Sequence, residues 1–419
     1  MSLVRAGRDL TEPTLSPDGE RVGFVQRWRG GSSIDVVQLT GGGVERQLTF
    51  GPDPAPGRGL GGGCFAWSGD GIVYAAVDGE LWRQVGLRLE RLTSHERTVR
   101  APAICGDLVV YAVDEAEVWL LDLGSGDGRR LDDGHHDFCF DPAISPDGRI
   151  VSWQAWSPPH MPWDAAVRID HDLTSGVTSE WRVHDGAVQQ PRFTPHGDPV
   201  HVHDGSGWLN VHVGDHPVLL EPLEHAGPTW GMGNRSYAFD DAGERMAFTR
   251  NEAGHGALCI VDLRSGAVEQ LGRGVHGHLS WIGDHLVTIR SGARTPTQIV
   301  HYDPDAGERT TVALSQPDVW PRDELPEPEL VRAPSEDGRT TLHARRFVAG
   351  QRRLLVWVHG GPTDQWQVDW RPRIVYWWSR GWDVLVVDPR GTTGHGRGYQ
   401  QALHGRWGRL DVDDTAELI

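Results

Sequence analysis

The chain of 419 residues carries a formal net charge of −18, and all 40 of its basic residues are arginine. This acidic balance argues against nucleic acid or an anionic membrane as a partner. The longest apolar runs have only the length of a strand, so no membrane span is expected. The first ten residues include charged residues and contain no long apolar stretch, so no signal peptide is expected. Four cysteines without C-x-x-C spacing argue against a zinc or disulfide framework and favour a reducing cytoplasm: Cys64, Cys105, Cys139 and Cys259.

A unit of strand, tight turn and strand recurs from Glu12 onward. The clearest turns are Ser16-Pro17-Asp18-Gly19 and Ser145-Pro146-Asp147-Gly148, in which proline presets φ, aspartate bonds back to the backbone and glycine takes a positive φ. Two further strand-like runs follow the turn in the better copies, so one unit holds four strands. Five weaker copies complete a set of seven, beginning at Cys64, Pro102, Pro191, Tyr237 and Leu279.

Four strands in a unit of roughly 40 to 50 residues are typical of a β-propeller blade. The sequence therefore predicts an all-β seven-bladed propeller over residues 11–315, after an N-terminal segment at 1–10. Residues 316–328 contain four prolines among several acidic residues. Because this composition cannot form a continuous helix or a central strand, we expect an interdomain linker there.

The remaining residues, 329–419, have the pattern of an α/β domain. Strands are expected near 329–332 and 340–347, around a turn at Ser335–Gly338. Two nearly all-apolar runs follow at 354–358 and 383–387, and a helix between them is predicted near 371–380. Such runs are typical of buried parallel strands joined by a crossover helix. A last helix is expected to start near Asp411 with three apolar residues at helical spacing: Val412, Ala416 and Ile419.

A glycine-containing loop follows each of the two buried strands. The first strand ends in His359-Gly360-Gly361-Pro362, and the second ends in Asp388-Pro389-Arg390-Gly391. Glycines at this place let the backbone approach a ligand and direct N–H groups at it, as an oxyanion hole requires. An HGGG-type loop after a strand has this role in α/β-hydrolases.

A propeller followed by these two loops resembles the prolyl oligopeptidase family of serine peptidases, and within it the bacterial acylaminoacyl-peptidase and dipeptidyl-peptidase-like branch. The resemblance implies a cytoplasmic hydrolase of short peptides, in which the propeller gates access to the active site. It places the oxyanion hole at Gly360, with Gly361 as its neighbour. It also implies a loop-positioning role for five residues: His359, Pro362, Asp388, Arg390 and Gly391. For Arg390 we expect a salt bridge that anchors the loop, with binding of a substrate carboxylate as the alternative.

The catalytic triad is missing from the sequence. The nucleophile elbow is G-x-S-x-G and the triad follows the order Ser, Asp, His. No G-x-S-x-G occurs in the 419 residues, and the only serine after His359 is Ser379, in a predicted helix. We therefore expect an incomplete α/β-hydrolase domain, truncated before the catalytic serine and inactive alone. Without the strand that leads to the serine, the edge of strand 354–358 is expected to be unpaired and the region after residue 330 poorly stable.

Two other functions stay open at this point. One is a non-catalytic propeller module that binds peptides or proteins and carries a vestigial hydrolase remnant. The other is an esterase, because His-Gly-Gly loops also serve lipases.

Groups that resemble ligand sites have structural explanations, and no metal or cofactor is expected. The loop Gly391–Gly396 lacks the spacing and the lysine of a phosphate-binding loop. The acidic residues of the last helix are expected to cap it or to favour its positive end: Asp411, Asp413 and Asp414. His201 and His203 are expected to be polar surface residues, although a metal site with nearby Asp198, Asp204 and His212 is an alternative. His135-His136-Asp137 is expected to be a loop, with a metal site again as the alternative.

Overall fold

The computed structural model describes residues 7–40, 43–57, 62–69, 71–317 and 321–419. Most of the predicted N-terminal segment, Asp70 in the second predicted turn and part of the predicted linker lie outside these residues. Strand makes up 47% of the structure and helix 7%, so the prediction of a mainly β protein is confirmed.

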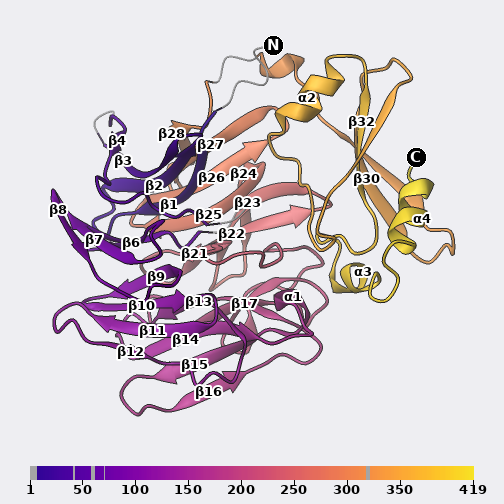
Figure 1. The fold of residues 1–419 in the computed structure, drawn as a ribbon. Coiled ribbons are helices and arrows are strands. Elements are labelled where there is room, and N and C mark those ends of the chain that lie inside the picture. The colour runs from indigo at the N-terminus through magenta and orange to yellow at the C-terminus, as the bar shows by residue number, and fades with distance from the viewer. Residues whose placement is uncertain (1–6, 41–42, 58–61, 70, 318–320) are drawn as a thin grey trace.

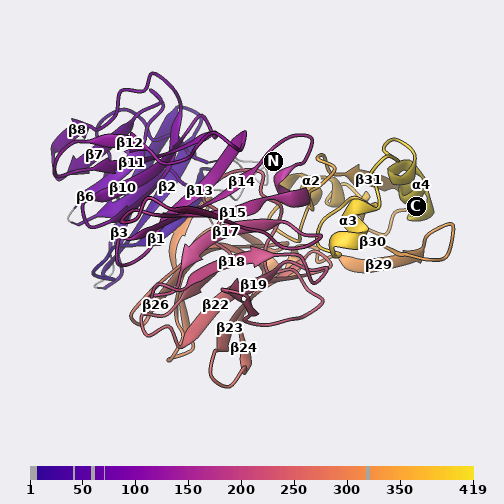
Figure 2. The same ribbon diagram turned by 90° about the horizontal axis from the view of Figure 1, so that it is seen from below.

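Residues 9–314 form seven consecutive four-stranded antiparallel sheets, in which the strands pair in chain order (Figures 1 and 2). The first four sheets are β1 Asp9–Leu15, β2 Arg21–Trp28, β3 Gly31–Gln38, β4 Arg46–Gln47; β5 Phe65–Ser68, β6 Gly71–Ala75, β7 Leu81–Val85, β8 Arg88–Arg91; β9 Val99–Cys105, β10 Leu108–Val113, β11 Glu117–Asp122, β12 Gly128–Arg130; and β13 Phe138–Ile144, β14 Ile150–Trp156, β15 Val167–Asp172, β16 Thr178–Trp181. The last three are β17 Val188–Phe193, β18 Pro199–His203, β19 Asn210–Val213, β20 His216–Pro217; β21 Tyr237–Phe239, β22 Arg245–Glu252, β23 His255–Asp262, β24 Val268–Arg273; and β25 Val275–Ile282, β26 His285–Gly292, β27 Thr295–Asp303, β28 Glu308–Leu314.

The Ser-Pro-Asp-Gly turns form as predicted between the first two strands of their sheets. The hydroxyl of Ser16 accepts a hydrogen bond from the N–H of Arg21 (3.0 Å). The hydroxyl of Ser145 accepts one from the N–H of Ile150 (2.8 Å). The turn glycines have φ values of 73° and 71°, a conformation that glycine adopts without steric cost.

The seven sheets close into a ring. The fourth strand of each sheet is largely exposed, so it lies outside, and the first strand lies inside. Neighbouring sheets share apolar cores; Val73 and Leu81 of the second, for example, pack with Val109 and Leu121 of the third. The first and last sheets also share a core, and β1 packs against β25 and β26. Packing between sheets therefore holds the ring together and closes it without an exposed first or last face.

The second unit is a mixed sheet in the order β29-β30-β32-β31, with β31 and β32 parallel. The crossover between these parallel strands contains helix α2, as predicted. Two further helices follow, and a short helix and a 3₁₀ turn lie earlier in the chain. The bounds are β29 Glu329–Pro334, β30 Thr341–Phe347, β31 Leu354–Val358, β32 Asp383–Asp388, α1 Pro162–Ala165, α2 Pro372–Trp378, α3 Arg397–Gln401, α4 Leu410–Glu417 and the 3₁₀ turn Arg322–Glu324.

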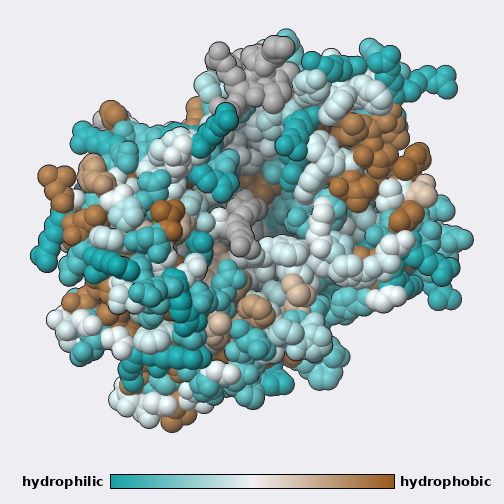
Figure 3. All heavy atoms as spheres, viewed as in Figure 1, coloured by the Kyte–Doolittle hydropathy of each residue, from teal (hydrophilic) through white to brown (hydrophobic). Residues whose placement is uncertain are grey.

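Strand β31 forms one edge of this sheet, and β29 forms the other. Leu354 and Val358 at its two ends are 37% and 49% exposed. Figure 3 shows hydrophobic residues gathered on this face of the second unit. Within the described residues, no helix is long and apolar enough to cross a membrane.

Helix α4 begins where it was expected, but its buried face was predicted wrongly. Val412 and Ile419, assigned to the apolar face, are 59% and 68% exposed. The helix instead buries Leu410 and Asp414. The expected aspartate N-cap is also absent, since Arg409 holds the N-cap position without a side-chain cap bond. On this buried side Asp414 forms an ion pair, which is described below.

Candidate active site

The loop after β31 and the loop after β32 are joined through His359. This side chain is buried, and its Nε2 lies 2.8 Å from Oγ1 of Thr392, which in turn donates to the carbonyl of Pro389 (2.7 Å). Gly361 has a φ of 136°, and a Cβ there would lie 2.9 Å from the backbone nitrogen of Thr363. The shape of the first loop therefore depends on glycine and on contact with the second.

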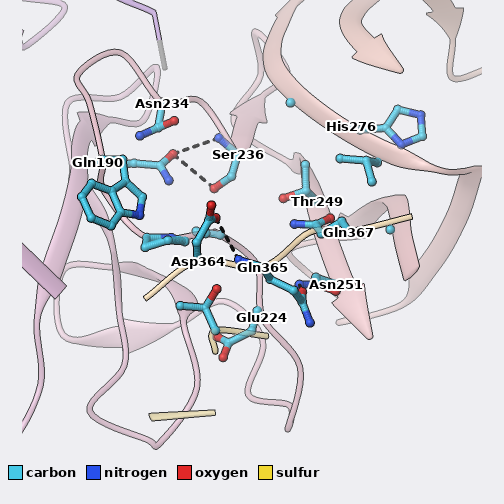
Figure 4. Close-up of a pocket in the computed structure, with 18 of the residues that line it drawn as sticks. Gln190, Glu224, Asn234, Ser236, Thr249, Asn251, His276, Asp364, Gln365 and Gln367 are labelled. Atoms are coloured by element: carbon cyan, nitrogen blue, oxygen red, sulfur yellow. Dashed lines mark hydrogen bonds between the residues drawn. The ribbon is translucent and has the colours of Figure 1, made fainter. Parts of the chain in front are cut away.

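Gly360 and Gly361 line a cavity of about 420 Å³ between this loop and the ring. A Cβ built on Gly360 would meet nothing within 4 Å, so its backbone borders open space. Figure 4 shows side chains from both parts of the chain around the cavity, with Asp364 and Gln365 opposite Gln190 and Ser236. The predicted oxyanion loop thus faces a space that the ring helps to enclose.

The second loop is anchored by a buried ion pair at Asp388. Arg345 of β30 donates two hydrogen bonds to this carboxylate (2.5 and 2.6 Å), and both side chains are almost fully buried. Gln365 adds a third hydrogen bond (2.9 Å), and His395 Nε2 lies 2.8 Å from the same carboxylate. Burial alone would raise the pKa of Asp388, but the charge of Arg345 and these hydrogen bonds outweigh it and hold the pKa below its usual range.

The same arginine connects the second unit to the ring. Arg345 also donates to the carbonyls of Ala253 (3.2 Å) and Trp366 (2.9 Å). Ala253 and Gly254 form the turn between β22 and β23, and a Cβ on Gly254 would lie 2.6 Å from Nη1 of Arg345. Asn251 at the end of β22 donates to Gln365 (2.7 Å). The ring, the loop after β31 and Asp388 therefore share one polar network.

The segment after Asp388 makes a second set of contacts with the ring. Glu224, fully buried in the connection after β20, accepts hydrogen bonds from the N–H groups of Gly396 (3.1 Å) and Leu209 (2.7 Å). Burial raises the pKa of Glu224 to about 7. Arg397, the first residue of α3, pairs with Asp204 of the ring at 2.7 Å. The loop Gly391–Gly396 was compared with a phosphate-binding loop in the sequence. In the structure, the N–H group of its last residue, Gly396, donates to the carboxyl group of Glu224.

Arg390 forms the salt bridge that the sequence suggested, and its partner is Asp414 of α4. The guanidinium lies 2.6 Å from the carboxylate, which also accepts the backbone N–H of Arg390 (2.8 Å). The hydrogen bonds that Arg390 donates to the carboxylate of Asp414 raise the pKa of Arg390. This pair fixes α4 against the loop that follows β32.

The histidine groups do not assemble into a metal centre. Rings of His203 and His212 stack with centroids 3.6 Å apart, and Arg168 lies 2.8 Å from Nδ1 of His201. Burial, and then the charge of Arg168, lower the pKa of His201 to about 2. His201, His203 and His212 are buried, so the expected surface location was wrong. Over the part of the chain that the structure describes, no three His, Cys, Asp or Glu side chains are grouped to hold a metal ion.

Sequence reasoning missed Arg345, Gln365, His395 and Glu224. A charged residue at a core-facing position of β30 was the available signal, because Arg345 shares its face of the strand with the buried Phe347. The other three lie in loops, where sequence spacing predicts no contact. Their roles depend on which distant segments meet.

Comparison with known proteins agrees with this geometry. Residues 366–419 match the family model described as the prolyl oligopeptidase family. Dipeptidyl-peptidase 5 of Aspergillus fumigatus is 34% identical over 68 residues, which are 15% of this chain and 9% of that protein. Dipeptidyl-peptidase 4 of Giardia intestinalis is 29% identical over 106 residues, 23% of this chain and 14% of that protein.

These comparisons support a likeness of the chain to the prolyl oligopeptidase family.

A solved structure extends the likeness to the whole fold. The Mycobacterium tuberculosis puromycin-hydrolyzing peptidase superposes with a TM-score of 0.86 at 24% identity, over 99% of this chain and 71% of that one. The likeness covers the ring as well as the second unit. By contrast, the matched segments span only about a tenth of the length of the curated relatives.

Proposed function

We propose that residues 1–419 supply the substrate-enclosing ring and the oxyanion loop of a serine peptidase that acts on short peptides. The observation that carries this proposal is the position of Gly360 and Gly361 on the cavity that the ring encloses. In the proposed reaction, the backbone N–H of Gly360 donates to the oxyanion of the tetrahedral intermediate. His359, Pro362, Asp388, Arg390 and Gly391 keep the two loops in place.

We assign the ring to a seven-bladed β-propeller over residues 11–315 that gates access to the cavity. Residues 316–328 are then the linker, and 329–419 are the first part of an α/β-hydrolase domain. The four cysteines are free, which supports a reducing compartment such as the cytoplasm.

The nucleophile of this reaction is not among the 419 residues, because they contain no G-x-S-x-G. We therefore propose that residues 1–419 alone do not form an acyl-enzyme. The same observation favours a second candidate function, a non-catalytic propeller that binds peptides. Sequencing the reading frame beyond codon 419 distinguishes the two, since only the peptidase needs an in-frame G-x-S-x-G.

A fluorophosphonate probe tests the proposal, because it labels a serine that has an active base and an oxyanion hole. We expect no labelling of residues 1–419 and labelling of a polypeptide whose frame continues into G-x-S-x-G. In that polypeptide, Gly360→Pro removes the N–H donor and should lower kcat by about 10²–10³-fold. Gly360→Ala keeps the donor and has room for its Cβ, so it is the control. Stoichiometric labelling of 1–419, or equal rates for the two variants, contradicts the proposal.

A further inference from the structure

The connection between β20 and β21 crosses the middle of the ring. Met232 in this connection packs against Ala101 and Phe140, which belong to the inner strands β9 and β13. The carbonyl of Met232 accepts a hydrogen bond from the N–H of Gly62 (2.6 Å), just before the second sheet. A segment that leaves the fifth sheet thus contacts the second, third and fourth sheets before it enters the sixth.

Hydrogen bonds fix this segment to inner strands on the other sides of the ring as well. The N–H of Gly233 donates to the carboxylate of Asp141 in β13, and the N–H of Ser236 donates to Oε1 of Gln190 in β17 (2.9 Å). Arg235 makes two bonds: its carbonyl accepts from the N–H of Leu279 in β25 (3.0 Å), and its Nη1 donates to Oγ1 of Thr14 in β1 (3.3 Å). Together with the contacts of Met232, these bonds connect residues 230–236 to six of the seven sheets. In each of the six, the contact is with the inner strand or with the residues that lead into it. The remaining sheet is the sixth, which the segment enters.

The inner strands are distorted where they meet this segment. Five of them have an irregular register with the second strand and a non-glycine residue with φ between 53° and 58°, which costs about 1–3 kcal/mol at each position: Glu12, Ala101, Asp141, Gln190 and His278. Two of these residues, Asp141 and Gln190, accept the hydrogen bonds of the segment. The strained positions therefore turn acceptors toward the axis.

The segment forms a wall between two cavities. One is the 420 Å³ cavity at Gly360, and the other, of about 590 Å³, is lined by the inner strands of the ring. Gln190, Asn234 and Arg235 line both cavities. Figure 4 shows Gln190 and Asn234 on the side of the first cavity opposite Glu224. The indole N–H of Trp230 also donates to the carbonyl of Thr363 (2.7 Å), so the wall is bonded to the oxyanion loop.

We propose that residues 230–236 are a plug that closes the axis of the ring and makes the cavity at Gly360 a dead end. A bound peptide then cannot pass through the ring, and one of its ends must lie inside the cavity against Asn234 and Arg235. The plug thereby selects peptides with at least one free end. This inference rests on the proposed function. The cavity of 420 Å³ is large enough for part of a peptide, since cavities that hold drug-sized ligands measure about 300–1,000 Å³.

Hydrogen exchange of the 419-residue chain tests the plug without any ligand. The N–H groups of Gly233 and Ser236 are hydrogen-bonded inside the ring, so a proteolytic fragment covering 230–236 should exchange slowly. In Gly233→Ala, the added Cβ would lie 2.1 Å from the nitrogen of Gly63, so the segment must shift and exchange should accelerate at least about tenfold. Gly128→Ala on the outer strand β12 meets only ordinary contacts and should change nothing. Exchange in the unmutated chain at the rate of an unstructured peptide overturns the plug.

Calorimetric titration with capped peptides tests the dead end. The probes are hexa-alanine with free ends, with a bulky naphthoyl-type cap on either end, and with caps on both ends. We expect one singly capped probe to bind like the free peptide and the doubly capped probe to bind at least about tenfold more weakly, equivalent to 1.4 kcal/mol. Gly233→Ala opens the second cavity and should reduce this penalty, whereas Gly128→Ala should retain it.

The outcomes separate this inference from the proposed function. Equal binding of all four probes refutes the dead end and leaves the peptide site intact. Binding of none of them refutes the proposed function and the selection of free ends, and hydrogen exchange then decides whether the axis is closed.

Discussion

Replacing Arg345 by methionine should destabilise the second unit strongly, because it leaves a buried carboxylate without its counter-charge. Arg345 and Asp388 have side chains that are 1% and 0% exposed. After the substitution, Asp388 keeps only Gln365 and His395 as side-chain partners. Removing one partner of a buried pair costs about 3–5 kcal/mol, and we expect a loss of this size in the free energy of unfolding at pH 7.

The loss should depend on pH in a defined direction. In the unmutated chain the pKa of Asp388 is lowered, so its contribution to stability is present above the unfolded pKa of about 3.9 and disappears as the pH falls through the folded pKa. Without Arg345, burial dominates and raises the pKa of Asp388, so the folded variant takes up a proton more readily than the unfolded chain. The difference between the two proteins should therefore shrink as the pH falls from 7 toward 4.

Urea unfolding followed by tryptophan fluorescence measures this difference. The matched control is Arg346→Met, because the side chain of Arg346 is 47% exposed. Its buried partner Asp383 keeps hydrogen bonds from the backbone N–H groups of Ala349 and Gly350, so we expect a loss of only about 1 kcal/mol. Adding Asp388→Asn to Arg345→Met removes the buried charge and should restore part of the stability. If Arg345→Met costs no more than Arg346→Met, the ion pair does not hold the loop as described.

Two further predictions follow from the contacts between the units. The pKa of Glu224 is raised from 4.5 to about 7. Its contribution to stability is therefore full below pH 4.5, and about 3 kcal/mol is lost as the pH rises through 7. Glu224→Gln should abolish this pH dependence in denaturant titrations at pH 5 and 8, and a dependence that persists in the variant contradicts the assignment. Because the ring closes on itself, residues 1–320 alone should melt in one sharp transition. In residues 1–419, the second unit has an exposed edge at β31, so it should unfold at a lower temperature than the ring and make the chain less soluble. Equal solubility and one common transition contradict this prediction.

Local chemistry explains which parts of the fold were predictable. The turns at Ser16–Gly19 and Ser145–Gly148 formed as expected because their hydrogen bonds and φ values involve neighbouring residues. The parallel strands β31 and β32 were also predictable, since both are apolar runs of strand length. For α4 the same reasoning from periodicity failed, because the buried side carries Leu410, Asp414 and Leu418, and Asp414 pairs with Arg390 of a segment that is distant in the chain.

The sequence by itself therefore determined the repeated four-stranded units, the crossover and the glycine turn after β31, because each is set by residues close together in the chain. Only the tertiary structure decided what surrounds that turn. Arg345 meets Asp388 across 43 positions, and Trp230 meets Thr363 across 133. Such pairs form only when the ring and the second unit are in place, and residues 230–236 have no pattern that indicates their path across the ring. Their course depends on strained acceptors contributed by distant strands, which no local pattern records.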